Sequence, residues 1–291
     1  MSRNKNRLDA SGLMDMPADA EPPSPNMVQP QSSMDMGWTT PTEMVDLPSQ
    51  GRYYPPDHPL YNISEIEIRH MTAKDEDILT NRSLLRKGLA LDRLIESVIV
   101  DKRVKADSLL LGDKNALLIA SRITAYGPEY STSITCPSCT KVQNYEFDLE
   151  DVGFNNAGTA ENSSGVHPTD SGTFIINLPI SDVDIEVRFL TGQDQRRLTQ
   201  EMERKRKRKI DSAAFTDQLK SFIVSVDGDE DKLSLQQFIV KMPARDARFL
   251  RQRYSELMPD MDLTQEFVCD SCGHEADVEV PLTSNFFWPD W

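Results

Sequence analysis

The chain has 291 residues, of which 38% are hydrophobic, and a formal net charge of −15 at pH 7. This length suffices for one large domain or two small ones, and so acidic a chain repels phosphates, which argues against general nucleic-acid binding. The apolar runs are far too short to span a bilayer, and the polar N-terminus lacks the apolar core of a signal peptide. We therefore expect a cytosolic protein without a membrane segment.

The first elements follow a long polar stretch. Residues 1–44 are rich in Pro, Ser, Asp and Met and show no period of a strand or a helix, which predicts a disordered tail. Residues 65–69 then alternate polar and apolar side chains, as a half-buried strand does. Thr72 follows as a helix N-cap, and the acidic residues 75–77 favour the first turn of that helix.

Two further helices are predicted before the first cysteine motif. Apolar residues recur at helical spacing over residues 84–100. Another helix is expected over residues 112–126, where Gly127 and Pro128 end it. Residues 151–172 contain mostly Asn, Gly, Ser and Thr, with almost no apolar residue to bury, which predicts a flexible linker.

The pattern of the first half returns after the linker. Residues 66–80 read IEIRHMTAKDEDILT and residues 185–199 read IEVRFLTGQDQRRLT, with nine of the fifteen positions matching in type. We interpret this as an internal duplication, with residues 45–150 as the first repeat and residues 173–291 as the second. Each repeat would run strand, helix, helix, cysteine knuckle and strand.

The cysteine motifs keep the same place in both repeats. Asp113 lies 23 residues before Cys136, and Asp246 lies 23 residues before Cys269. An alternating strand follows each motif, and the final leucine of that strand lies ten positions after the second cysteine in both cases. The two motifs would therefore be equivalent ends of the two repeats, and they could meet in space although 129 residues separate Cys139 from Cys269.

All four cysteines belong to the two Cys-x-x-Cys motifs, Cys136/Cys139 and Cys269/Cys272. In a reducing cytosol such pairs are more often metal ligands or redox centres than disulfides. Four thiolates make a closed tetrahedral zinc site, so we expect these cysteines to hold one structural zinc ion in a zinc ribbon. A redox pair, an iron–sulfur site and two metal-free knuckles stay open as alternatives.

Two surface features could bind partners. The basic run from Arg204 to Lys209 is either a solvated helix end or a patch for nucleic acid or an acidic protein face. The C-terminus carries four candidate partner-binding aromatics, Phe286, Phe287, Trp288 and Trp291. We expect the two phenylalanines to pack on their own domain and the two tryptophans to anchor an interface.

The sequence contains no motif or group of residues that indicates catalysis. It has no P-loop, no G-x-G-x-x-G and no G-x-S-x-G motif. None of the four histidines lies at a metal-ligand spacing from another, and a site with four thiolates has no open position for a catalytic water. We therefore do not expect an enzyme.

A set of short motifs occurs in a characteristic order: LPSQGRYYP at 47–55, IRHMT at 68–72, DEDIL at 75–79, LGD at 111–113, RITAYG at 122–127, CPSC at 136–139 and FFW at 286–288. In these motifs the chain resembles the baseplate hub and hub-assembly proteins of T-even-like contractile-tailed bacteriophages. The resemblance covers residues 45–291 and leaves out the N-terminal tail. Family members are often shorter, so the tail and the linker are departures.

This resemblance implies a non-enzymatic protein that helps to build the central hub of the baseplate. Its partners would be other hub or tail proteins, and it would be present in the host cytoplasm during assembly or in the virion. The alternative is a zinc-ribbon nucleic-acid-binding factor that uses the basic run. The expected fold is α+β, with two diverged strand–helix–helix–knuckle repeats joined at one zinc ribbon behind a disordered N-terminal tail.

Overall fold

The computed structural model describes residues 39–155, 166–169, 171–208, 214–282 and 286–287. The chain divides into two compact units, Met1–Thr39 and Thr40–Trp291, and almost all of the first lies outside the described residues. The second mixes helices and strands, so the expected α+β class is confirmed. Within the described residues, no helix is both long enough and apolar enough to cross a membrane.

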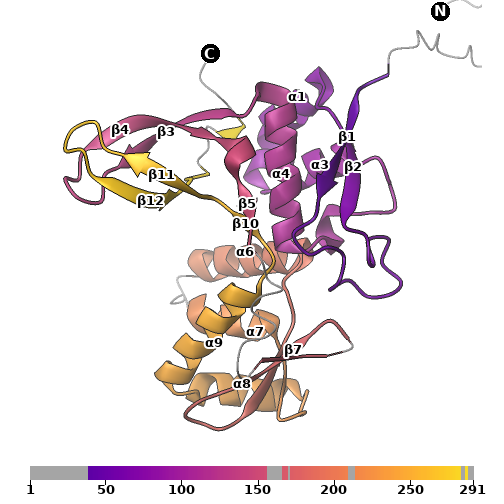
Figure 1. Cartoon of the computed structure of the whole chain (residues 1–291). Coiled ribbons are helices and arrows are strands. Elements are labelled where there is room, and N and C mark those ends of the chain that lie inside the picture. The colour runs from indigo at the N-terminus through magenta and orange to yellow at the C-terminus, as the bar shows by residue number, and fades with distance from the viewer. Residues whose placement is uncertain (1–38, 156–165, 170, 209–213, 283–285, 288–291) are drawn as a thin grey trace, which may run out of the picture. The chain divides into compact units, whose positions relative to one another are not determined.

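The first half contains one strand pair, four helices and one long hairpin (Figure 1). Strand β1 (Thr42–Asp46) pairs antiparallel with β2 (Glu65–Arg69), so the last residues of the stretch predicted as tail, 42–44, belong to a strand. The remaining elements are α1 (Ala73–Thr80), α2 (Arg82–Arg86), α3 (Ala90–Val98), the 3-10 turn η1 (Ala106–Ser108), α4 (Leu111–Tyr126), β3 (Glu129–Thr135), β4 (Val142–Asp148) and the 3-10 turn η2 (Leu149–Asp151).

The prediction of one continuous helix over residues 84–100 is wrong. This segment is divided into α2 and α3, because Gly88 takes a left-handed conformation with φ of 65° directly after the C-cap of α2. Glycine adopts this conformation without a steric penalty, and it ends a helix there. The helix predicted over residues 112–126 is confirmed as α4.

In its described residues, the second half contains a four-stranded antiparallel sheet in the order β6-β7-β8-β9 and the helices α6, α7, α8 and α9. The strands are β6 (Val166–Pro168), β7 (Phe174–Asn177), β8 (Asp184–Val187) and β9 (Ile223–Val226). The helices are α6 (Gly192–Lys207), α7 (Ala214–Phe222), α8 (Lys232–Lys241) and α9 (Ala244–Leu257). A second hairpin follows, formed by β11 (Thr264–Val268) and β12 (Glu275–Glu279).

The stretch predicted as a flexible linker contains two strands. Besides β6, it includes β5 (Gly153–Phe154), which pairs antiparallel with β10 (Met261–Asp262) far along the chain. The pairing of β5 with β10 is non-local, whereas β6 pairs with the next strand, β7. A strand of two or three residues has no periodicity that its own sequence can reveal. Residues 156–165 and residue 170 of the predicted linker lie outside the described residues.

The start of each half is stabilised by the same kind of ion pair, between a partly exposed arginine and a buried aspartate. Arg69, at the end of β2, donates to Asp75 in the first turn of α1, with a distance of 2.7 Å. Arg188, just after β8, donates to Asp194 in the first turn of α6, also at 2.7 Å. Each aspartate also accepts the backbone N–H of the N-cap threonine, so the predicted capping of α1 by Thr72 is confirmed.

The halves also share an aspartate in the first turn of the helix that leads to each hairpin. Asp113 of α4 accepts hydrogen bonds from the backbone N–H and the hydroxyl of Ser49, at 2.9 and 2.6 Å. Asp246 of α9 accepts from the N–H and the hydroxyl of Ser181, at 3.0 and 2.6 Å. Both aspartates are fully buried. Asp113 ties the N-terminus of α4 to the loop after β1, and Asp246 ties the N-terminus of α9 to the loop between β7 and β8.

The two halves are also packed against each other. The backbone N–H of Leu111 in α4 donates to the carbonyl of Leu190 at 3.1 Å. Buried Lys114 forms an ion pair with Asp92 at 2.6 Å, and Arg196 of α6 approaches the same carboxylate at 2.9 Å. One continuous cluster of buried apolar residues runs through both halves. The helices and sheets of the two halves therefore share one core.

Candidate metal centre

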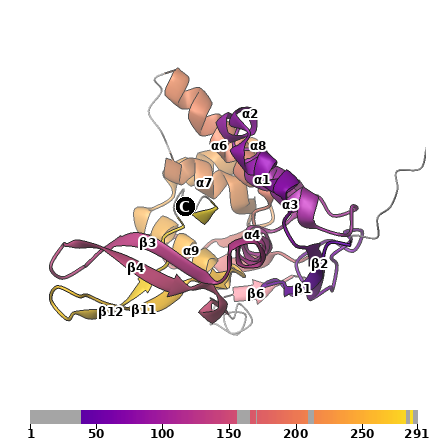
Figure 2. The same ribbon diagram turned by 90° about the horizontal axis from the view of Figure 1, so that it is seen from above.

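The four cysteines lie at the tips of two antiparallel hairpins. Strands β3 and β4 pair from Glu129↔Asp148 to Thr135↔Val142, and the first Cys-x-x-Cys motif forms the turn. Strands β11 and β12 pair up to Val268↔Glu275 around the second motif. Figures 1 and 2 show the two hairpins side by side. We call this pair of hairpins the ribbon.

Both cysteine turns are closed by the same backbone hydrogen bonds. In the first, the N–H of Cys136 donates to the carbonyl of Lys141 at 2.9 Å, and the N–H of Thr140 donates to the carbonyl of Cys136 at 3.0 Å. In the second, the N–H of Gly273 donates to the carbonyl of Cys269 at 2.8 Å. Each turn thereby places the two sulfurs of its motif on the same side.

The residue after the second cysteine differs between the turns. Thr140 and Gly273 occupy the same position, and both have a positive φ, of 60° and 66°. Glycine takes this conformation without steric conflict, whereas a β-branched threonine does so at a cost. The first turn therefore contains backbone strain that the second lacks.

The sulfur atoms of the two turns interdigitate. Cys136 Sγ lies 3.8 Å from Cys272 Sγ, and Cys139 Sγ lies 3.7 Å from Cys269 Sγ. All four sulfurs lie within 4.8 Å of one another. A zinc–sulfur distance of about 2.3 Å in a tetrahedron places sulfurs about 3.8 Å apart, whereas a disulfide requires about 2.0 Å. The donor set and its spacing fit a four-thiolate metal site better than two disulfides.

The thiols affect one another's ionisation. The backbone N–H of Cys139 donates to the sulfur of Cys136 and lowers the pKa of that thiol to about 6. At Cys272 the N–H of His274 favours the thiolate, but the loss of water and the neighbouring thiols raise its pKa to about 11. Four adjacent thiols cannot all ionise without a cation to offset their charge, and a metal ion supplies that charge.

A small apolar cluster lies directly beneath the cysteines. Phe267 is fully buried with Cys136 and Cys269, and the ring of Tyr145 packs on Phe267 with centroids 5.1 Å apart. The hydroxyl of Tyr145 donates to the carbonyl of Glu266 across the two hairpins at 3.2 Å. In the described part of the chain each hairpin is a two-stranded sheet of its own, so no strand ladder joins them. The two hairpins contact each other through side chains and through the cysteine cluster.

The C-terminal phenylalanines close the base of the ribbon. Phe286 and Phe287 retain only 5% and 4% of their accessible surface, and the ring of Phe286 packs on Tyr130 of β3. Arg122 of α4 donates to the carbonyl of Phe286 at 2.7 Å. Their packing on the same domain is as expected, and it leaves neither side chain free for a partner. Trp288 and Trp291 lie outside the described residues.

The basic run forms the C-terminal end of α6. Arg204, Arg206 and Lys207 are exposed, as is the C-cap Arg208. Lys205 differs, because its ammonium group forms an ion pair with Asp217 of α7. Lys209 lies outside the described residues. The run is therefore a solvated helix end, where cations also interact favourably with the helix dipole.

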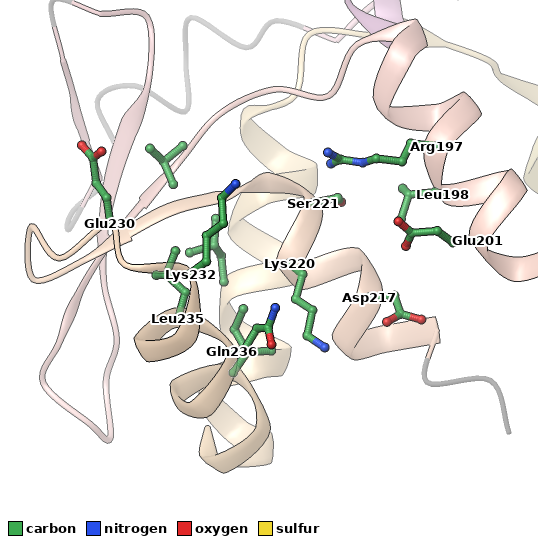
Figure 3. Close-up of a pocket in the computed structure, with 13 residues that line it drawn as sticks. Arg197, Leu198, Glu201, Asp217, Lys220, Ser221, Glu230, Lys232, Leu235 and Gln236 are labelled. Atoms are coloured by element: carbon green, nitrogen blue, oxygen red, sulfur yellow. The ribbon is translucent and has the colours of Figure 1, made fainter. Parts of the chain in front are cut away.

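A hollow of about 600 Å³ lies between α6, α7 and α8, with β9 at one side (Figure 3). Its lining carries equal numbers of both charges, from Arg197, Lys220 and Lys232 and from Glu201, Asp217 and Glu230. Among the described residues that line it, none is a histidine or a cysteine. The hydroxyl of Ser221, which lines the hollow, donates to the backbone carbonyl of Gln218 at 2.5 Å.

One serine–histidine pair cannot be recognised from a local motif, because its members lie 50 positions apart in the chain. His58 Nε2 lies 2.9 Å from the hydroxyl of Ser108. However, the Nδ1 atom accepts the backbone N–H of Leu60, so the neutral ring carries its proton on Nε2 and donates to the serine. Burial lowers the pKa of His58. The imidazole is thus in the wrong tautomer to act as a base on Ser108.

Comparison with known proteins places the chain in one family. The family described as T4 bacteriophage base plate protein matches residues 40–288, which include both halves and the whole ribbon. No curated protein and no solved structure matches the chain.

Proposed function

The chain belongs to the T4 bacteriophage base plate protein family, and on that premise we propose that it is a non-enzymatic structural and assembly protein of the central baseplate hub. Its partners are other hub or tail proteins, and it acts in the host cytoplasm during assembly and in the virion tail. The family match over residues 40–288 is the observation that carries this proposal. The wrong tautomer of His58 and the lining of the hollow support a role without catalysis.

A structural zinc ion forms the second part of the proposal. The ligands are Cys136, Cys139, Cys269 and Cys272, whose sulfurs all lie within 4.8 Å of one another. Zinc suits this site because four thiolates provide the charge and the tetrahedral arrangement that it prefers. The ion would have no open coordination position, so its role is to join the hairpins.

The two halves, in this proposal, are diverged copies of one repeat. The support lies in paired contacts: Arg69 with Asp75 and Arg188 with Asp194. The buried aspartate that precedes each hairpin recurs as well, 23 residues before the first cysteine in each half. Because each half contributes one hairpin and two cysteines, the metal would join equivalent ends of the two copies.

Inactivating the gene in the phage that encodes it tests the baseplate role. We expect electron micrographs of the lysate to show heads, and tails without complete baseplates, and we expect a plasmid copy of the wild-type gene to restore them. Mass spectrometry of purified virions should detect the chain together with hub proteins. Normal baseplates without the protein would overturn the proposal.

Metal analysis of the untagged, purified protein tests the zinc site. We expect one zinc per chain, and loss of that zinc in Cys136→Ser and Cys269→Ser. The matched control is Ser138→Ala, because this exposed residue lies between the first two cysteines and contributes no ligand. Iron, two disulfides or a metal-free wild-type protein would each overturn the assignment.

The alternative, a nucleic-acid-binding factor, is supported only by the basic end of α6. Binding of DNA or RNA should then weaken steeply with added salt, since it would depend on phosphate contacts. We expect the purified protein to show no such binding near physiological salt, because its net charge is −15. A salt-dependent shift abolished by Arg204→Glu would favour the alternative.

A further inference from the structure

The outer face of the β11–β12 hairpin has no partner in the described structure. Alternate residues of the two strands point away from Phe267 and the cysteines, and four of them are exposed carboxylates: Glu266, Glu275, Asp277 and Glu279. We call these four residues the acidic face. Within the described residues, no ion pair involves any of them.

The acidic face is electrostatically unfavourable when it stands alone. In the hairpin register, Glu266 lies directly opposite Asp277. Like charges directly opposite in a strand pair are destabilising, whereas opposite charges there contribute roughly 0.2–1 kcal/mol. The hairpin has only a small apolar cluster to offset this cost. A cationic partner on this face would remove the repulsion.

The same chain carries a matching cationic surface, which the proposed function does not use. At the end of α6, Arg204, Lys207 and Arg208 are all exposed, and residues three and four apart lie on one side of a helix. We call these three residues the basic helix end. Within the described residues, none of the three forms an ion pair, unlike their neighbour Lys205, which contacts Asp217.

The two surfaces also match in spacing. One helical turn separates Arg204 from Arg208, which corresponds to a rise of about 6 Å. Alternate residues on one face of a strand, such as Glu275, Asp277 and Glu279, follow one another at about 7 Å. Cations one turn apart on the helix can therefore face successive carboxylates along β12. Arginine adds geometric specificity, because its guanidinium binds a carboxylate with two hydrogen bonds.

From these observations we propose that the basic helix end of one copy docks on the acidic face of a second copy. The contact joins two different surfaces, so it leaves one unused surface at each end of a dimer. Such head-to-tail contacts form a ring if the rotation closes and an open chain if it does not. This self-association goes beyond the proposed function, and it does not depend on the protein being a hub component.

Global and local charge act in opposite directions in this contact. Two copies, each with a net charge of −15, repel each other at long range, and the local pairs attract at short range. At physiological ionic strength, salt largely screens the interaction between exposed charges that lie more than about 8 Å apart. We therefore expect the contact to be weak and concentration-dependent in free protein.

Two charge-reversal variants test the contact. In the first, Arg204→Glu, Lys207→Glu and Arg208→Glu invert the basic helix end. In the second, Glu266→Lys, Asp277→Lys and Glu279→Lys invert the acidic face. All changed residues are exposed, and circular dichroism and metal content establish that each variant is folded. The matched control inverts three exposed cations around another helix end, with Arg82→Glu, Arg86→Glu and Lys87→Glu.

Sedimentation velocity over a hundredfold range of concentration gives the readout. We expect the average mass of the wild type and of the α2 control to rise with concentration. Each charge-reversal variant should stay a monomer, with a dissociation constant raised at least tenfold. An equimolar mixture of the two variants should associate again, because both contacts between unlike variants join opposite charges. The reversed helix end of one variant meets the reversed acidic face of the other, and the two unchanged surfaces also match.

The proposal is overturned by a wild type that stays monomeric over the whole range. It is also overturned by a charge-reversal variant that associates like the wild type, or by a mixture of variants that stays monomeric. Binding of the basic helix end to DNA in a monomeric wild type would assign that surface to nucleic acid instead. Recovery of association in the mixture is the result that no general loss of stability can imitate.

Discussion

The body of the protein and its ribbon are stabilised in different ways. The body, which comprises the helices and the sheets outside the two hairpins, has a continuous apolar core that runs through both halves. The cysteine end of the ribbon buries only Cys136, Phe267 and Cys269, and its outer strand positions are mainly polar or charged. Burial of apolar surface, at about 25 cal/mol per Å², can stabilise the body. The cysteine end of the ribbon buries too little apolar surface for this and therefore depends on its cysteines.

Loss of a cysteine should have the largest effect and should be confined to the ribbon. We expect Cys136→Ser to abolish metal binding, whose apparent free energy is about 10–16 kcal/mol in small structural zinc sites. Hydrogen exchange should then show lost protection in both hairpins, including the strand before Cys269, and unchanged protection in α3 and α4. Unchanged exchange in β11 would contradict a shared site.

Breaking the ion pairs of the two buried aspartates, Asp75 and Asp194, should affect the body instead. Arg69→Met leaves the buried carboxylate of Asp75 without its cation, which typically costs 3–5 kcal/mol. Arg188→Met should cost less, because the Arg188 side chain is 36% exposed and that of Arg69 is 24% exposed. Urea unfolding would measure both. The control is Arg103→Met, which removes an exposed ion pair and should cost at most about 1 kcal/mol.

Acid should weaken the body through the same aspartates. Burial by itself would raise the pKa of Asp75, but hydrogen bonds from Arg69 and Thr72 hold it well below the usual value of 3.8. Because the folded pKa is lower than the unfolded one, this carboxylate stabilises the protein above about pH 4 and loses that effect as the pH falls further. The same sign applies to Asp194, whose pKa is also lowered.

The measurement is the free energy of unfolding between pH 2 and pH 7, compared with that of Asp75→Asn. This variant should be less stable at neutral pH and should show a shallower decline in acid. Metal release from the ribbon is followed separately, because acid also protonates the thiolates. An equally steep decline in the variant would remove Asp75 from the explanation.

The smallest effect should distinguish the two cysteine turns. Thr140→Gly should relieve the left-handed strain of the first turn and stabilise the ribbon by about 1 kcal/mol, less the hydrogen bond that the threonine hydroxyl donates to the Cys139 carbonyl. The reverse change, Gly273→Thr, should destabilise the second turn by a similar amount. The apparent metal affinity of each variant measures both effects, and equal affinities would show that φ does not limit the site.

Much of the local structure could be predicted from short segments. Thr72 with Asp75 specifies a helix start by side-chain chemistry that needs no other part of the chain, and Gly127 marks the end of α4 in the same way. The division between α2 and α3 depends on Gly88, a single residue inside an otherwise periodic apolar segment. The pairing of β5 with β10 could not be predicted, because it joins short segments about a hundred residues apart.

The sequence by itself determined which residues could form the metal site and that the two motifs stand at equivalent places, since spacing and thiol chemistry are properties of the chain. Only the tertiary structure decided that the four sulfurs meet, because that depends on how α4 and α9 orient their hairpins through the shared core. It also decided that Phe286 and Phe287 are buried while the acidic face stays exposed. Burial is a property of packing between distant segments, and no local pattern contains it.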